Sequence, residues 1–331
     1  MKKKLISYYL LSYLCFLVAL LCHEAAIIQP AILLTLSIFQ TKTILIRKSH
    51  ILILPFLVIS FLHLWFIFSI SLPSQESYLP VFSIKKVVNN LSWYILWSFG
   101  LPETLVDFIG PGLKINPNFI KWFRIYSIIM FPLLGLMMFL ISLLLFIHRK
   151  LFYKNKYLII FSICFIISVS PFLLFPSHKF VYYLSYAIVW FSGAFGIILV
   201  NAWEKKMLSK VLTVVIILSF AVVSFQTIRL NSITHWAAKR AKAAEVLVKQ
   251  FMNNYPPPIK DKAFFIVDDP SYPNLGAEWG TSSRQAFYIL SGSDALKLLY
   301  KDPSLQVYFQ AIESPPKNLK KIIIHMAKFP Y

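Results

Sequence analysis

The chain has 331 residues, of which 58% are hydrophobic and 14% are charged. This composition excludes an ordinary soluble globular protein and indicates a polytopic membrane protein. The net charge of +20 is typical of nucleic-acid binders, but the basic residues are confined to particular loops, which fits membrane topology better. We therefore expect no nucleic-acid partner. All three cysteines, Cys15, Cys22 and Cys164, lie in apolar runs and resemble packed thiols rather than disulfides or metal ligands.

Seven apolar segments predict membrane spans. Three lysines precede the first segment, as in a signal peptide, but no small-residue cleavage site comes before His23, so we expect a retained span. The short loops on the N-terminal side are rich in Lys and Arg, whereas the short turns on the other side carry almost no positive charge, with Lys179 as the exception. This asymmetry predicts a cell-membrane protein with a cytoplasmic N-terminus and an extracytoplasmic C-terminus. The predicted spans are residues 5–22, 25–40, 51–72, 125–147, 157–175, 180–201 and 209–228.

Composition divides the chain into three parts. Residues 1–229 are the predicted transmembrane domain, with a long interfacial outer loop at residues 73–124. Residues 230–255 predict an amphipathic juxtamembrane helix, because their apolar side chains follow a helical stripe. Residues 256–331 alternate strand and helix patterns after a proline run. The expected fold class is an α-helical polytopic membrane protein of about seven spans with a small C-terminal α/β extracytoplasmic domain.

The elements expected in this last part are short. Residues 291–294 resemble a capping box that opens a helix. Asp268 and Asp269 follow the first strand, where open α/β sheets bind ligands, but the same residues are ordinary turn formers, and we expect a structural turn. The expected elements are strands at residues 263–267, 305–309 and 321–324 and a helix at residues 294–300.

His23 and Glu24 are adjacent ionisable residues with apolar sequence on both sides. They lie at a turn between two membrane helices or just inside one of them. Because charge at membrane depth is costly, such a pair indicates a functional site by default. A solvated turn at the membrane interface explains the pair equally well.

The outer segment contains an aromatic stretch that is too short to span. Trp93, Tyr94 and Trp97 can share one broad face of a helix in the headgroup region, and Glu103 follows after a Leu-Pro pair. A long apolar outer loop usually has a function, and we favour the roof of a cavity over a lipid-anchored spacer. Asn90 also begins a glycosylation sequon, which matters only in a glycosylating host.

His178 and Lys179 form a second pair at a predicted outer turn, with Tyr182 close behind. A Lys at the membrane boundary is suited to a lipid phosphate, because its ammonium is a compact point charge. A lysine that snorkels at a helix end is a common alternative. Topology places this turn on the same side as His23 and Glu24.

In residues 20–34, His23 and Glu24 are followed by Pro30 and a Leu-rich stretch. This segment resembles one found in polytopic GT-C glycosyltransferases, particularly the TPR-containing O-mannosyltransferase-like group, close to glycosyltransferase family 39. Glu24 and Pro30 match the Glu and Pro of that segment, and His23 stands where the family usually has Lys.

A second segment, residues 178–185, is similar to another stretch of the same family. Lys179 stands for its Arg, while Tyr182 and Ser185 match its Tyr and Ser. The aromatic pattern before Glu103 is also similar to the outer loop of such proteins. The likeness extends over the seven predicted spans and does not include the C-terminal part.

The resemblance implies a hexosyltransferase that takes a sugar from a polyprenyl-phosphate donor on the outer leaflet. In such enzymes a carboxylate base removes the acceptor proton, and a divalent metal or basic residues stabilise the departing phosphate. That carboxylate normally lies well ahead of the Lys-Glu segment, whereas one span precedes His23 here, so we expect the N-terminal catalytic half to be missing. The chain is then either a fragment or split gene product, with a partner subunit that carries the missing half, or a degenerate member that no longer catalyses transfer. The residues expected to bind donor phosphate or acceptor are His23, Glu24, His178, Lys179 and Tyr182, roofed by Trp93, Trp97 and Glu103.

Three functions remain open from the sequence. The first is the glycosyltransferase. The second is a non-catalytic membrane module that binds a polyprenyl lipid or a partner enzyme. The third is a transporter in which His23 and Glu24 relay protons, although no internal repeat supports it. The catalytic residues stay unassigned.

Overall fold

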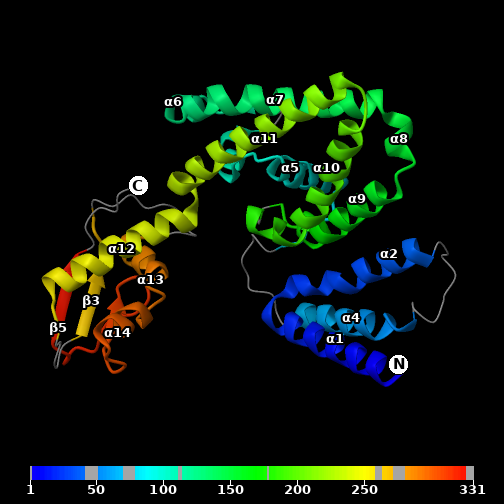
Figure 1. Ribbon diagram of the computed structural model, residues 1–331. Helices are drawn as coiled ribbons and strands as arrows, with labels where there is room; N and C mark the ends of the chain where they lie inside the picture. The colour runs from blue at the N-terminus through cyan, green and yellow to red at the C-terminus, as the bar shows by residue number, and fades with distance from the viewer. Residues whose placement is uncertain are drawn as a thin grey trace. The chain divides into compact units, whose positions relative to one another are not determined.

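The computed structural model describes residues 2–41, 51–69, 79–110, 114–176, 179–257, 263–270 and 280–325 (Figure 1). The chain forms two compact units, Met1–Ile228 and Arg229–Tyr331. Most of the described chain is helical, with a few short strands, as the sequence predicts.

The first unit is a set of apolar helices joined by short 3-10 segments and turns. One small antiparallel pair of strands, β1 (Ile109–Gly110) and β2 (Lys114–Ile115), interrupts it. Its helices are α1 (Lys2–Cys22), η1 (Glu24–Ile28), α2 (Gln29–Thr41), α4 (Leu54–Ser69), α5 (Ile84–Ser98), η3 (Glu103–Phe108), α6 (Pro117–Trp122), α7 (Arg124–Ile147), α8 (Arg149–Tyr153), α9 (Lys156–Val169), η5 (Ser170–Leu174), η6 (Val181–Tyr186), α10 (Ile188–Trp203) and α11 (Met207–Thr234), whose last residues extend past the unit.

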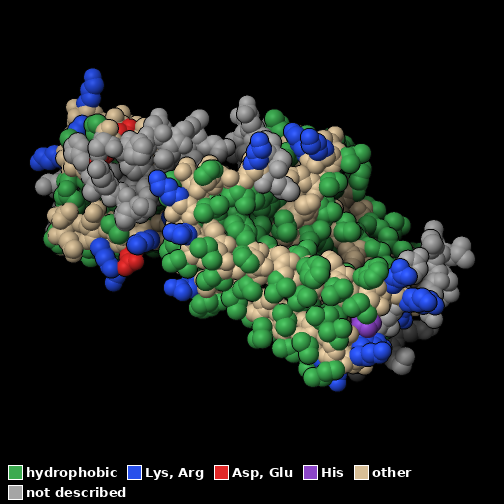
Figure 2. Space-filling view, turned by 90° about the horizontal axis from the view of Figure 1, so that it is seen from above, with side chains coloured by type: hydrophobic (Ala, Val, Ile, Leu, Met, Phe, Trp, Pro, Cys, Tyr) green, Lys and Arg blue, Asp and Glu red, His purple; other side chains and the backbone are tan. Residues whose placement is uncertain are grey.

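Within the part of the chain that the structure describes, three stretches of helix are long and apolar enough to cross a membrane. They are Arg124–Ile147, Lys156–Leu174 and Met207–Thr234, and shorter apolar helices occupy the other predicted spans. Many large apolar side chains on these helices point outward, and Figure 2 shows hydrophobic side chains over much of the visible surface. A surface of this kind is stable against lipid rather than water. The membrane assignment made from composition is therefore supported.

Two basic turns lie at the same end of this unit. The His148 ring is 2.9 Å from the Ser209 hydroxyl, so the turn between α7 and α8 lies beside the start of α11. The Thr227 hydroxyl, five helical turns further along α11, donates to the Gly100 carbonyl that follows α5. The end near Ser209 carries exposed Lys and Arg side chains, at Arg149, Lys150, Lys154, Lys156, Lys205 and Lys206.

The second unit has a parallel three-stranded sheet in the order β4-β3-β5. The strands are those predicted, and their apolar side chains pack with one face of α12 around Phe251, Phe264 and Ile266. The elements are α12 (Trp236–Asn254), β3 (Ala263–Val267), α13 (Ser282–Ile289), α14 (Asp294–Tyr300), β4 (Val307–Phe309) and β5 (Lys321–His325).

The predicted capping box is wrong. Ser293 is the N-cap of α14, and its side chain makes no capping hydrogen bond. Ser291 and Gly292 instead have positive φ angles, and the Gly292 amide donates to the Phe287 carbonyl at 2.8 Å. These residues therefore end α13, a helix that the sequence analysis did not predict, rather than begin α14.

Candidate functional site

The outer segment packs on the chain around η5 and η6. The Asn90 side-chain amide donates to the Leu173 carbonyl at 2.8 Å, and the Val81 amide donates to the Leu174 carbonyl at 2.8 Å. The Glu103 carboxylate accepts from the Val181 amide at 3.2 Å. Because three polar contacts join segments far apart in sequence, residues 81–103 are a fixed part of the helical unit.

The three aromatic side chains predicted to share a face of α5 are all buried. Tyr94 is completely buried, and Trp93 and Trp97 are 7% and 5% exposed. The rings contact one another, with centroids 5.8 Å apart for the two tryptophans and 5.3 Å for Tyr94 and Trp97. The aromatic face of α5 is thus packed inside the protein, where it can form one wall of a site.

Tyr94 was predicted to share this helical face but was not named among the site residues. Burial raises the pKa of its hydroxyl above the ordinary value, and the nearby Tyr182 and Glu103 raise this pKa further. The Tyr94 hydroxyl therefore stays protonated and lies beside two of the predicted site residues. Its place between Trp93 and Trp97 was the available signal, because it indicated the same helical face.

Lys179 is half-buried at the turn between η5 and η6. Burial lowers the pKa of its ammonium group, and no carboxylate of the described residues forms an ion pair with it. A partly desolvated cation without a counter-charge favours the approach of an anion. Its neighbour Tyr182 is 45% exposed and lies over Phe180, with ring centroids 5.4 Å apart.

His23 lies where α1 ends and η1 begins. Its Nδ1 accepts from the Ala25 amide at 3.1 Å, so the ring caps the short helix. The ring also meets the edge of Tyr186, with centroids 5.4 Å apart. Both side chains line a cavity of about 410 Å³ between α1, α2, α4 and η6, which also includes Gln29. His23 therefore faces a hollow with a few polar groups.

The structure places the predicted residues in two groups along η6. Glu103, Lys179 and Tyr182 lie near its first residues, and His23 lies against its last residue, Tyr186. Lys179 does not line the cavity at His23. Glu24 begins η1, but its side chain, like the whole of His178, lies outside the described residues.

Two other candidates have structural roles. Asp268 accepts from the Ser283 amide at 2.9 Å and so satisfies the start of α13, and the Asp269 amide donates to the Ser282 hydroxyl at 2.8 Å. Within the described ranges, no group of three or more His, Cys, Asp or Glu residues is placed to hold a metal ion. Asn90, the first residue of the sequon, is completely buried in the folded chain, where its amide donates to the Leu173 carbonyl.

Comparisons with protein-family models, with curated proteins and with solved structures find no match for this chain. The strongest features are the half-buried Lys179 and the buried aromatic face of α5.

Proposed function

We propose that the chain is a GT-C-like membrane glycosyltransferase that binds a polyprenyl-phosphate-linked sugar at the outer end of its helical unit. The observation that carries the proposal is Lys179, a half-buried cation without a described counter-charge, next to the exposed ring of Tyr182. A phosphate would supply the missing negative charge, and an aromatic ring offers an apolar surface to a sugar. Glu103 fixes the backbone that carries both side chains.

The proposed topology has seven spans, a cytoplasmic N-terminus and an extracytoplasmic C-terminal α/β domain. The contact between His148 and Ser209 supports it, because it brings two Lys- and Arg-rich turns to one end of the unit. Such turns favour the cytoplasmic side of a membrane. Lys179, Glu103 and His23 would then share the opposite side, where His23 adds a second polar group near the lipid.

A non-catalytic module that binds the same lipid is the second candidate. Glu103, the carboxylate among the predicted site residues that contacts the start of η6, accepts from the Val181 amide, as a structural residue does. This contact favours a binding role over a role as general base. A partner subunit would then supply the catalytic carboxylate.

Lipid binding tests the proposal first. The full chain in phosphatidylcholine nanodiscs is titrated with a polyprenyl phosphate. Lys179→Gln should weaken binding by about tenfold to a hundredfold, because a charge-assisted contact contributes about 1.5–3 kcal/mol. His23→Ala should weaken it less. Lys86→Gln, an exposed lysine of α5, is the matched control and should leave binding unchanged. Unchanged binding in both site variants would rule out the proposed site.

Sugar transfer then separates the two candidates. The same nanodiscs receive a polyprenyl-phosphate sugar and an acceptor peptide or glycan, and release of polyprenyl phosphate is measured. Transfer that Lys179→Gln abolishes supports the enzyme. Binding without transfer in the wild-type chain supports the module.

A further inference from the structure

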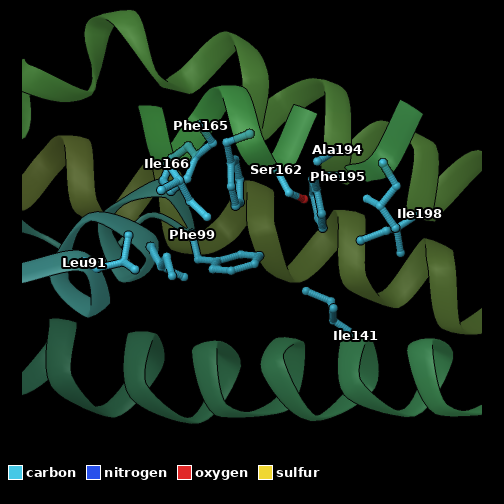
Figure 3. Close-up of a pocket in the computed structure, with 12 residues that line it drawn as sticks. Leu91, Phe99, Ile141, Ser162, Phe165, Ile166, Ala194, Phe195 and Ile198 are labelled. Atoms are coloured by element: carbon cyan, nitrogen blue, oxygen red, sulfur yellow. The ribbon is translucent and has the colours of Figure 1, made fainter. Parts of the chain in front are cut away.

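A second cavity lies away from the proposed site, between α5, α7, α9 and α10. It has a volume of about 250 Å³. Figure 3 shows Phe99 and Phe195 turned into the same space, with Ile141 approaching from α7. Of its lining residues, Ser162 alone has a polar side chain. A charged or strongly polar ligand would find no partner in this lining.

The mouth of this cavity is marked by the lining residues that are exposed at the protein surface. Ser162 and Ile166 lie on α9, and both are exposed, Ile166 at 48%. Helix α9 belongs to a stretch that is long and apolar enough to cross a membrane. The cavity therefore opens on a surface that contacts hydrocarbon, not water.

We infer that this cavity binds one acyl chain of a bilayer phospholipid. A smaller apolar cavity of about 150 Å³, lined by Leu, Ile and Phe, stays dry and takes up benzene, so a cavity of this size has room for a segment of chain. Filling it restores the dispersion contacts that an empty cavity loses.

Mass action decides which chain enters. The lining has no charged group that selects a headgroup, so the cavity recognises hydrocarbon alone. The most abundant chain in the membrane then occupies it, and this is the acyl chain of the bulk phospholipid. The inference does not depend on the proposed glycosyltransferase function, because it involves neither Lys179 nor His23.

Photolabelling locates the bound acyl chain directly. The full-length protein is placed in phosphatidylcholine nanodiscs that contain a phosphatidylcholine with a diazirine in one acyl chain, and the labelled residues are mapped by mass spectrometry. We expect labels on the lining of α9 and α10, including Ile166, Ala194 and Ile198. Labels confined to outward-facing residues elsewhere on the helices would overturn the inference.

Filling variants test the cavity itself. Ala194→Phe should reduce labelling of the other lining residues about tenfold, a change that corresponds to about 1.4 kcal/mol. Val200→Phe, at a 59% exposed position of the same helix, is the matched control and should leave labelling unchanged. Ser162→Phe blocks the exposed mouth with little risk to folding, and it should reproduce the loss. Undiminished labelling in a folded Ser162→Phe protein would contradict the inference.

A competition experiment shows whether the bound hydrocarbon is a phospholipid acyl chain or an isoprenoid chain. A small mole fraction of polyprenyl phosphate is added to the same nanodiscs. Labelling of the lining by phosphatidylcholine should persist, because the bulk lipid remains in large excess. Loss of labelling at this low fraction would show that the cavity selects an isoprenoid chain, and the phospholipid assignment would be wrong.

Discussion

The two units of the chain place their large apolar side chains in opposite ways. In the helical unit, Leu21 is 86% exposed and Phe139 is 63% exposed, whereas in the C-terminal unit Phe264 is completely buried and Phe251 is 2% exposed. The first arrangement is stable only where lipid covers the surface, and the second is the usual one in water. The comparison teaches that burial has to be judged against the solvent of each unit.

The largest expected effect is a loss of stability when a Phe of the C-terminal unit is replaced by Ala, compared with the same replacement in the helical unit. Phe264 lies in β3, and its ring meets Phe251 and Tyr300 at centroid distances of 5.2 and 5.6 Å. Phe264→Ala should reduce the free energy of unfolding of the C-terminal unit by about 3–5 kcal/mol, because it leaves a cavity in the core. Hydrogen exchange at the amides of β3, in the full-length protein in detergent, measures this loss.

Phe139→Ala is the control in the helical unit. Its ring is mostly outside the protein, so the change should cost less than about 1 kcal/mol, as outward-facing substitutions away from packed contacts usually do. The comparison between the units would fail if Phe139→Ala destabilised α7 as strongly as Phe264→Ala destabilises β3.

A smaller effect is expected where the helical unit buries a polar group. Asn90→Ala removes the donor to the Leu173 carbonyl, and the buried carbonyl then loses its partner. The expected loss of stability is about 1–3 kcal/mol. Thermal unfolding of the full chain in nanodiscs checks it. This test sharpens the comparison, because a buried hydrogen bond matters in either solvent.

Ser92→Ala provides the matched control for Asn90. Ser92 is exposed and donates to the carbonyl one turn before it, so its removal should leave the melting temperature nearly unchanged. Both variants destroy the glycosylation sequon. If Ser92→Ala destabilised the protein as much as Asn90→Ala, the buried contact to Leu173 would not be the cause.

Local patterns in the sequence were enough to predict much of the secondary structure. The apolar runs gave the helices, and the short β-branched and aromatic runs gave β3, β4 and β5. Helix α13 was missed because its polar residues, among them Ser282, Ser283 and Gln285, are buried by contacts that only the folded unit provides. Pattern rules assign polar residues to the surface, so they could not identify this helix.

The candidate site was less accessible to sequence reasoning. The pattern identified Lys179, Tyr182 and His23 one by one, and the structure places Lys179 and His23 toward different ends of η6. The contact between Glu103 and the Val181 amide depends on the path of the chain between α5 and η6. No spacing rule contains that information, because the two residues belong to different segments.

A pH-dependent effect is expected in the C-terminal unit. Partial burial raises the pKa of Asp268, but hydrogen bonds from the Ser283 side chain and amide outweigh it and hold the pKa below its usual value. A carboxyl group with a lowered pKa contributes stability above its unfolded pKa of about 3.9, and the contribution is lost as the pH falls through the folded value. Stability of this unit should therefore fall below about pH 4.

Asp268→Asn separates this contribution from general acid effects. It keeps an oxygen that can accept from the Ser283 amide but removes the negative charge near a helix N-terminus, so it should cost at most about 1 kcal/mol at pH 7. It should also remove most of the loss of stability below about pH 4. Glu313→Gln, at an exposed position, is the control and should change neither. The stability of the C-terminal unit is measured by urea unfolding of the full-length protein at several pH values, with hydrogen exchange of the β3 amides as the readout. If Asp268→Asn lost stability below about pH 4 as steeply as the wild-type chain, Asp268 would not be the source of the pH dependence.

The smallest effect should come from two glycines on the same helix, α10. A Cβ atom at Gly193 would lie 3.0 Å from the Phe161 ring of α9, whereas a Cβ atom at Gly196 would meet nothing within 4 Å. Ala is the better helix former by about 0.5–1 kcal/mol, so Gly196→Ala should raise the melting temperature slightly. Gly193→Ala should lose that gain, because α9 and α10 must move apart.

The difference between these two variants measures how closely α9 and α10 approach each other. We expect the free energy of unfolding of Gly193→Ala to be about 1 kcal/mol below that of Gly196→Ala in nanodiscs, since even small overpacking is unfavourable in a well-packed contact. The two glycines share a helix and a solvent, so neither propensity nor lipid exposure accounts for such a difference. Equal melting temperatures would mean that Phe161 moves aside at little cost and that this contact does not limit the packing of the helical unit.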